Sequence, residues 1–227
     1  VEGNFDDAQT GVKNIFAACA DGKLLEGKGI ELSSANSINI GRLAPQITYY
    51  FKAYADLMNR GEIALGDKVN FSVPTGNFGD ILAGYLAKKL GLPVGKLICA
   101  SNRNNVLTDF FESGTYYTHR TFFKTMSPSM DILVSSNLER LLFEYADRDP
   151  AVVKGWMQQL KECGSFSIGA QRLEEIRKVF WADYADDAMT AEEIRRVHDR
   201  YRYVMDPHTA VASHALQNYR MKTGDRA

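Results

Sequence analysis

Short apolar runs alternate with helix-period segments over the first two thirds of the chain. The runs over 29–33, 68–73, 97–100 and 131–135 predict strands, and the stretches between most of them have apolar residues at helical spacing. Strands that alternate with helices are typical of a parallel sheet covered by helices. The pattern therefore predicts an α/β fold.

Helical spacing and boundary residues locate the helices. A first helix is expected from Asp6 or Asp7 to about Ala20, and a second is expected around an apolar face from Ile47 to Met58. Further helices are predicted from Asp80 to Leu90, from Asn104 to Glu112, and after the capping-box pattern Ser136–Glu139.

The pattern changes after Pro150, where only helices are predicted. Thr190–Glu193 has the form of a second capping box. Asp206 followed by Pro207 predicts the N-cap and first position of a final helix that runs toward Met221.

Composition narrows the classes of partner. Among 227 residues, 27 basic and 28 acidic side chains give a net charge of −1. The chain therefore has no overall positive charge that would attract nucleic acid or an anionic membrane. The three cysteines, Cys19, Cys99 and Cys163, have neither zinc spacing nor a disulfide framework, so a cytoplasmic location is expected. No apolar run is long enough to predict a membrane span.

The segment from Lys68 to Gly91 carries the strongest functional signal. A β-type run stops at Pro74, a turn with Gly76 and Gly79 follows, and a helix begins near Asp80. Free amide groups at a helix start attract phosphate, and glycines allow close approach or positive φ. The turn is therefore a candidate phosphate cradle, although an empty turn explains the same residues and no nucleotide motif matches. Asp80 is expected to cap the helix.

Several further sequence motifs occur in order along the chain. They are Gly3–Asp7, Ser34–Asn39 with Arg42 and Gln46, Pro74–Asp80, Thr125–Ile132, and Asp206–Val211. Together they resemble the threonine synthases of the bacterial and fungal type, which are pyridoxal-phosphate enzymes of the tryptophan-synthase β-like fold. The resemblance implies a three-layer parallel sheet flanked by helices, with residues 1–150 as the α/β cofactor domain and 151–227 as its helical C-terminal extension.

The resemblance also implies residue roles. The cofactor pyridoxal 5'-phosphate would be held through its phosphate by residues that match the family's loop: Thr75, Gly76, Asn77, Phe78, Gly79 and Asp80. The family's Schiff-base lysine precedes this loop in chain order. Lys124 follows it and is therefore expected to be a surface charge. The chain is expected to be an internal segment that lacks the catalytic lysine, and the remainder of its own polypeptide is an expected partner.

The substrate implied by the resemblance carries a second phosphate. Asn36, Ser37, Asn39 and Arg42 are the candidates for it, since a guanidinium grips phosphate and amides and hydroxyls fill the remaining acceptor sites. The alternative is that Asn36 to Arg42 is a turn and helix entry with ordinary capping.

Three functions remain open. The resemblance implies the conversion of O-phospho-L-homoserine and water to L-threonine and phosphate, with this chain inactive alone. A threonine synthase-like phospho-lyase that yields 2-oxobutyrate would share the loop. A noncatalytic α/β module that has lost cofactor binding is the third possibility.

Overall fold

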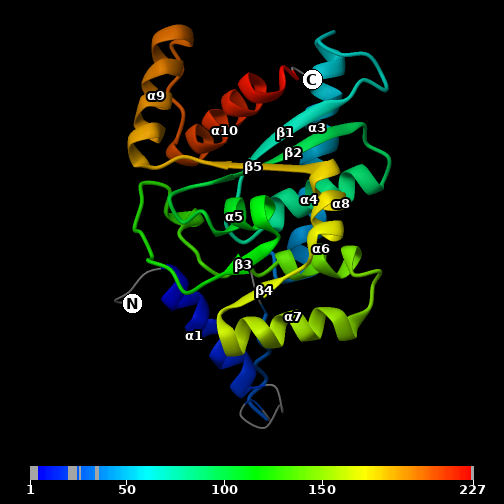
Figure 1. Ribbon diagram of the computed structural model, residues 1–227, viewed down its shortest axis with the longest axis vertical. Coiled ribbons are helices and arrows are strands. Elements are labelled where there is room, and N and C mark those ends of the chain that lie inside the picture. The colour runs from blue at the N-terminus through cyan, green and yellow to red at the C-terminus, as the bar shows by residue number, and fades with distance from the viewer. Residues whose placement is uncertain (1–4, 20–24, 26, 34–35, 226–227) are drawn as a thin grey trace.

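A three-stranded parallel sheet forms the centre of the computed structural model, which describes residues 5–19, 25, 27–33 and 36–225. Its strands are β1 (Val69–Pro74), β2 (Val94–Ser101) and β5 (Phe180–Tyr184), in the order β1-β2-β5 (Figure 1). A separate antiparallel pair joins β3 (Thr115–Tyr117) to β4 (Ser165–Ser167). The predicted α/β fold with a parallel sheet is confirmed.

Helices cover both faces of the sheet. One face packs against α4 (Gly79–Lys89), α5 (Val106–Ser113) and α8 (Ala170–Val179), and the other face packs against α10 (Pro207–Thr223). Because β2 is covered on both sides, its last five residues are all buried, as expected for a central parallel strand. The three layers follow from this arrangement.

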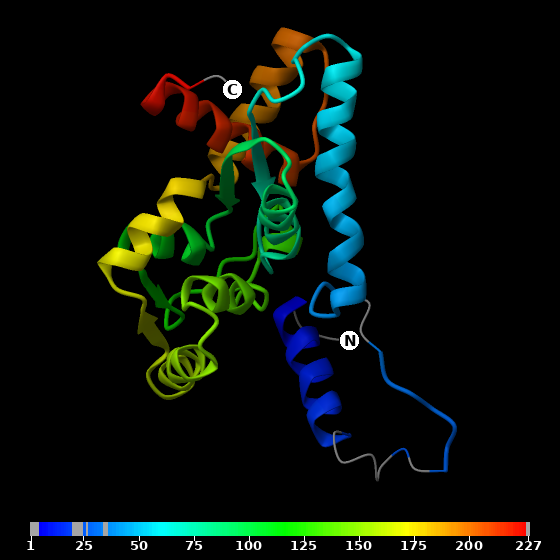
Figure 2. The same ribbon diagram turned by 90° about the vertical axis from the view of Figure 1, so that its right-hand side faces the viewer.

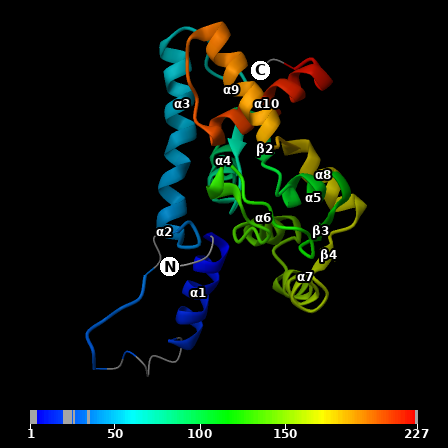
Figure 3. The same cartoon turned by 90° about the vertical axis from the view of Figure 1, so that its left-hand side faces the viewer.

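The remaining helices surround this core. The long helix α3 runs beside α4 along one side of the sheet, and α1 extends away from the body (Figures 2 and 3). The helices not yet given bounds are α1 (Phe5–Ala18), α2 (Ile40–Leu43), α3 (Ile47–Asn59), α6 (Leu138–Tyr145), α7 (Pro150–Cys163) and α9 (Asp187–Tyr201), with short 3-10 turns η1 (Ala44–Gln46) and η2 (Pro128–Met130).

Two predicted strands are wrong. Residues 29–33 form a turn followed by an irregular stretch, and residues 131–135 form no strand. In the second segment the Asp131 carboxylate accepts hydrogen bonds from the Thr125 amide (3.0 Å) and from the side-chain amide of Asn102 (2.7 Å). A buried carboxylate that binds local donors holds this segment as a loop.

Both predicted capping boxes are also wrong. Helix α6 starts after Asn137, whose side chain makes no cap bond, and α9 starts after Asp186, whose carboxylate accepts from the Met189 amide. Asp206 does cap α10, with Pro207 at its first position, as predicted.

The C-terminal part is mainly helical, as predicted, but the prediction of helices alone after Pro150 is wrong, because this part also contributes β4 and β5 to the two sheets. Because β5 pairs with β2, residues after 150 complete the central sheet. A division of the chain near residue 150 stays a prediction.

Candidate functional site

The candidate phosphate loop, residues 75–81, lies at the carboxyl end of β1. Strand β1 ends at Pro74 and α4 begins at Gly79, so four residues make the connection. The Thr75 amide donates to the Ala100 carbonyl of β2 at 2.8 Å, which fixes the start of the loop against the neighbouring strand. This end of a parallel sheet is where ligands bind in open α/β folds.

Apart from that of Thr75, the amide groups of this loop lack hydrogen-bond partners within the described part of the chain. Within the described part of the chain, none of the six consecutive amides from Gly76 to Ile81 donates a hydrogen bond, and the first helical bond of α4 comes from the Leu82 amide to the Phe78 carbonyl. Uncapped amides at a helix start carry partial positive charge and bind anions. The loop therefore offers a row of main-chain donors suited to phosphate oxygens.

The left-handed residue of the loop is Phe78, with φ 63° and ψ 10°, and neither Gly76 nor Gly79 has positive φ. The positive φ that the sequence analysis allowed for a glycine is therefore taken by an aromatic residue instead. Phe78 is 1% exposed, and its ring packs against Phe111 and Phe180 at centroid distances of 6.1 and 5.8 Å. Burial of the ring offsets the cost of about 1–2 kcal/mol of the left-handed backbone.

The two glycines are needed for close approach. A Cβ on Gly76 would lie 2.7 Å from the Ser129 carbonyl oxygen, and a Cβ on Gly79 would lie 2.7 Å from Ser37 Cβ and closer still to Ser37 Oγ. Both distances are shorter than van der Waals contact. The loop is thus enclosed by backbone from η2 on one side and by Ser37 on the other.

Asp80 does not cap α4, which corrects the prediction. Phe78 occupies the N-cap position, and the Asp80 carboxylate instead accepts from the Tyr50 hydroxyl at 3.2 Å, while that hydroxyl also lies 2.8 Å from the Asp80 carbonyl oxygen. Desolvation raises the pKa of Asp80, and the Tyr50 hydroxyl partly opposes this rise. Tyr50 therefore holds the acidic group at a side of the helix, where a donor from α3 engages it.

A third segment, which we call the brace (residues 135–140), supports the loop. The Ser135 hydroxyl donates to the Gly76 carbonyl at 2.8 Å. Asn137, fully buried, donates to the Asn77 carbonyl through both its backbone amide (3.0 Å) and its side-chain amide (2.9 Å). Sequence reasoning gave Asn137 only a helix-start role, because its contacts are 60 residues distant along the chain.

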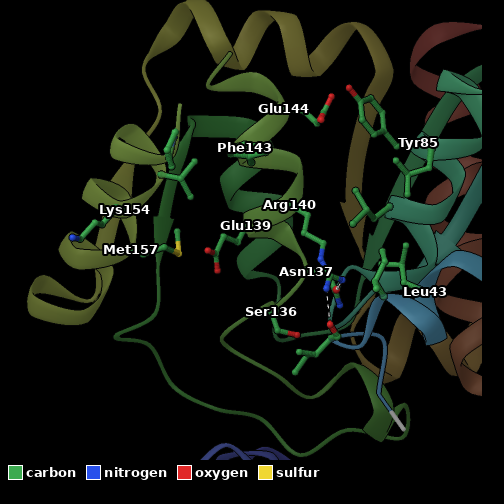
Figure 4. Close-up of a pocket in the computed structure, with 16 residues that line it drawn as sticks. Leu43, Tyr85, Ser136, Asn137, Glu139, Arg140, Phe143, Glu144, Lys154 and Met157 are labelled. Carbon is green, nitrogen blue, oxygen red and sulfur yellow. Dashed lines mark hydrogen bonds between the residues drawn. The ribbon is translucent and has the colours of Figure 1, made fainter. Parts of the chain in front are cut away.

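The brace also lines a cavity of about 750 Å³ between α2, α4, α6 and α7 (Figure 4). Apolar side chains such as Leu43, Phe143 and Met157 form much of its wall. Arg140 and Asn137 lie at the end nearest the phosphate loop.

The four substrate candidates lie near the loop to different degrees. Ser37 is packed against Gly79, and its hydroxyl accepts from the Asn137 side chain at 3.0 Å. Asn36 Oδ1 accepts from the Ile38 amide and Asn39 Oδ1 from the Gly41 amide, which is the local turn and capping arrangement of the alternative interpretation. Arg42 is exposed on α2.

Other predicted residues have clear positions. Lys124 is exposed, in agreement with a surface role. Gly3, Asn4, Ser34 and Ala35, which belong to the motifs of the resemblance, lie outside the described residues.

The described residues fit a phosphate-bearing cofactor. The loop amides from Gly76 to Ile81 make no hydrogen bond within the described part of the chain, and the Ser101 hydroxyl at the carboxyl end of β2 is buried there without a hydrogen-bond partner. By contrast, the described ranges contain no cluster of three His, Cys, Asp or Glu side chains that could hold a metal ion. No helix in these ranges has both the length and the apolarity needed to cross a membrane.

The chain was compared with protein-family models, curated proteins and solved structures, and no family model matches it. A threonine synthase from Pseudomonas aeruginosa is 46% identical over 220 residues, which are 97% of this chain and 45% of that protein. The human threonine synthase-like 1 is 43% identical over 225 residues, which are 98% of this chain and 30% of that protein.

Two solved structures that are similar to this chain are also threonine synthases. The pyridoxal-phosphate-bound threonine synthase from Brucella melitensis superposes with a TM-score of 0.83 at 45% identity, over 96% of this chain and 44% of that one. The yeast threonine synthase gives a TM-score of 0.83 at 38% identity, over 98% of this chain and 44% of that one. The chain spans less than half the length of each of these relatives. Over that segment, the chain is a homologue of the threonine synthase family.

Proposed function

We propose that this chain forms the part of a threonine synthase that binds the phosphate of pyridoxal 5'-phosphate. The single observation that carries the proposal is the row of six unbonded amides from Gly76 to Ile81. It is supported by the similarity to a pyridoxal-phosphate-bound threonine synthase. The proposed cofactor site consists of Thr75, Gly76, Asn77, Phe78, Gly79 and Asp80.

In this proposal the chain binds the cofactor phosphate and thereby orients the cofactor. The amides of Gly76 to Ile81 donate to the cofactor phosphate, and the Phe78 ring anchors the loop so that these donors are preorganised. Tyr50 engages the Asp80 carboxylate, which lessens the repulsion between that group and a bound anion. When bound, pyridoxal phosphate would supply an electron sink for negative charge that develops on the substrate carbon.

The proposed substrate is O-phospho-L-homoserine, which reacts with water to give L-threonine and phosphate. Its phosphate would be bound in part by the segment with Asn36, Ser37, Asn39 and Arg42. The contact of Ser37 with Gly79 supports a position beside the cofactor loop. The side-chain oxygens of Asn36 and Asn39 accept local bonds that shape the turn. The side-chain nitrogens of these two residues, the Ser37 hydroxyl and the Arg42 guanidinium are the proposed donors to the substrate phosphate.

The whole reaction would require the remainder of a longer polypeptide, since the chain spans less than half of its relatives. A covalent cofactor lysine would come from that remainder, and the isolated chain is expected to release no phosphate from O-phosphohomoserine. A role in threonine biosynthesis and a cytoplasmic location are parts of the same proposal.

Equilibrium dialysis tests the cofactor site. We expect pyridoxal phosphate to bind the chain weakly, inorganic phosphate to compete with it, and pyridoxal without phosphate to bind less. No imine absorbance should appear. Equal retention of pyridoxal and pyridoxal phosphate would overturn the proposed cradle and favour the noncatalytic module.

A second candidate function is the threonine synthase-like phospho-lyase, which yields 2-oxobutyrate. The identity of 43% to human threonine synthase-like 1 is close to the 46% identity to the bacterial threonine synthase, so the chain is about as similar to a protein named only as threonine synthase-like as to a threonine synthase. Product analysis on a polypeptide that carries this chain and its catalytic lysine separates the two, since one releases threonine and the other 2-oxobutyrate.

A further inference from the structure

The brace joins two segments that the proposed function assigns to different phosphates. The first is the phosphate loop, residues 75–81, and the second is the Ser37 segment, which we define as residues 36–43. The side-chain amide of Asn137 donates to the Asn77 carbonyl at 2.9 Å and to Ser37 Oγ at 3.0 Å. One buried side chain thus binds both segments at once.

Arg140 extends the same connection. Its Nη1 donates to the Ser37 carbonyl at 2.9 Å and to Asn137 Oδ1 at 2.5 Å, and its Nη2 donates to the Ile38 carbonyl at 2.5 Å. A guanidinium is planar, so its donors fix these acceptors in one arrangement. Arg140 therefore orients the Asn137 amide (Figure 4). It also holds the Ser37 segment through two consecutive carbonyls.

The bonds of Asn137 leave little freedom. Both the donor and the acceptor of its side chain form hydrogen bonds, since the amide nitrogen donates to two segments and the oxygen accepts from Arg140. Its backbone amide donates to Asn77 as well, at 3.0 Å. If Ser37 moved without Asn77, the buried side-chain amide of Asn137 would lose one of its two hydrogen bonds, and this loss costs free energy.

We propose that Asn137 and Arg140 are positioning residues that couple the site for the substrate phosphate to the site for the cofactor phosphate. This inference rests on the proposed function for the identity of the two anions. Neither residue contacts the reacting atoms in this proposal. They set the register between the loop amides and the Ser37 segment, so an anion that orders one segment also orders the other.

Hydrogen exchange on the ligand-free chain tests the physical connection. The variants are Asn137→Ala and Arg140→Gln, and the matched control is Arg148→Gln, because Arg148 is paired with Glu144 on the surface and has no bond to either segment. We expect exchange of the bonded amides in the Ser37 segment, and of the Asn137 amide that donates to the Asn77 carbonyl, to rise about tenfold in Arg140→Gln, since several hydrogen bonds are lost together. The control should match the parent chain. Unchanged exchange in Arg140→Gln, in a chain whose circular dichroism is native, would overturn the proposal even if Asn137→Ala fails to fold.

A second arm adds pyridoxal phosphate. In the parent chain we expect the cofactor to protect the phosphate loop and also the Ser37 segment, whereas in Arg140→Gln it should protect the loop alone. If Arg140 has a purely structural role, the cofactor will still protect both segments in Arg140→Gln. That result would overturn the coupling. If the parent chain does not bind pyridoxal phosphate, the proposed function fails, and the ligand-free arm still decides whether the brace connects the segments.

Discussion

Gly79 is the position where a single methyl group tests the packing of the candidate site. Its Cβ, if present, would lie 2.7 Å from Ser37 Cβ, whereas carbon atoms in contact are about 3.5–4.0 Å apart. Since Ser37 is itself bonded to Asn137, it cannot move without the loss of a hydrogen bond. Overpacking of this kind costs about 1–3 kcal/mol.

The matched control is Gly155→Ala in α7, where an added Cβ meets no atom within 4 Å. That change is expected to stabilise the chain by about 0.5–1 kcal/mol through helix propensity alone. Gly79→Ala should therefore have a free energy of unfolding about 1–3 kcal/mol below that of the parent chain, and about 1.5–4 kcal/mol below that of Gly155→Ala. In a chain of this size the difference corresponds to a Tm lower by roughly 2–4 °C per kcal/mol.

Ser37→Gly supplies the rescue, because it removes both atoms that the new methyl group meets. Urea unfolding of the single and double variants gives the interaction energy between the two positions. We expect Gly79→Ala to be tolerated much better in the Ser37→Gly background. If Gly79→Ala is as stable as Gly155→Ala in the parent chain, Ser37 does not pack against the loop, and this reasoning is refuted.

Three further outcomes are expected. Phe78→Ala should reduce the free energy of unfolding by about 3–5 kcal/mol, measured by urea denaturation, because the buried ring is lost while the left-handed backbone remains; a loss under about 1 kcal/mol would contradict the anchoring role. Burial raises the pKa of the Cys99 thiol to about 12. A disulfide reagent should therefore modify exposed Cys163 in the native chain and react with Cys99 only on unfolding. Reaction of Cys99 in the native chain would contradict its position in the core. The Thr209 hydroxyl and the amides at the start of α10 hold the pKa of Asp206 below its ordinary value of 3.8, so its stabilising effect is present above pH 3.8 and is lost as the pH falls through the lower folded pKa. In acid unfolding, Asp206→Asn should therefore lose less stability than the parent chain over this range, and identical pH profiles would argue against the effect.

The sequence predicted those elements whose evidence is local. Strand β1, helix α4 and the loop between them follow from an apolar run, a glycine-bearing turn and a helical apolar face, and all three are present. The α10 start was also found, since Asp206 and Pro207 act within one turn. Strand β5 was missed because its five residues, Phe180–Tyr184, lie in a strongly charged helical region and are selected by pairing with β2.

The details of the site depend on contacts between distant segments, which local patterns do not report. The glycines of the loop could take positive φ at the least cost, but the buried aromatic cluster places Phe78 in that conformation. The capping role given to Asp80 was replaced by the hydroxyl of Tyr50, which is 30 residues away along the chain. The brace residue Asn137 had the appearance of a helix start, and only the fold brings it to Asn77 and Ser37.

The proposed cofactor site depends on the amides from Gly76 to Ile81, which would bind the phosphate group of pyridoxal phosphate. Nuclear magnetic resonance of the nitrogen-15-labelled chain during titration with pyridoxal phosphate tests it residue by residue. We predict saturable shifts of these six amide signals, reproduced by inorganic phosphate and absent with pyridoxal. Shifts confined to other residues, or equal shifts with pyridoxal, would contradict the account.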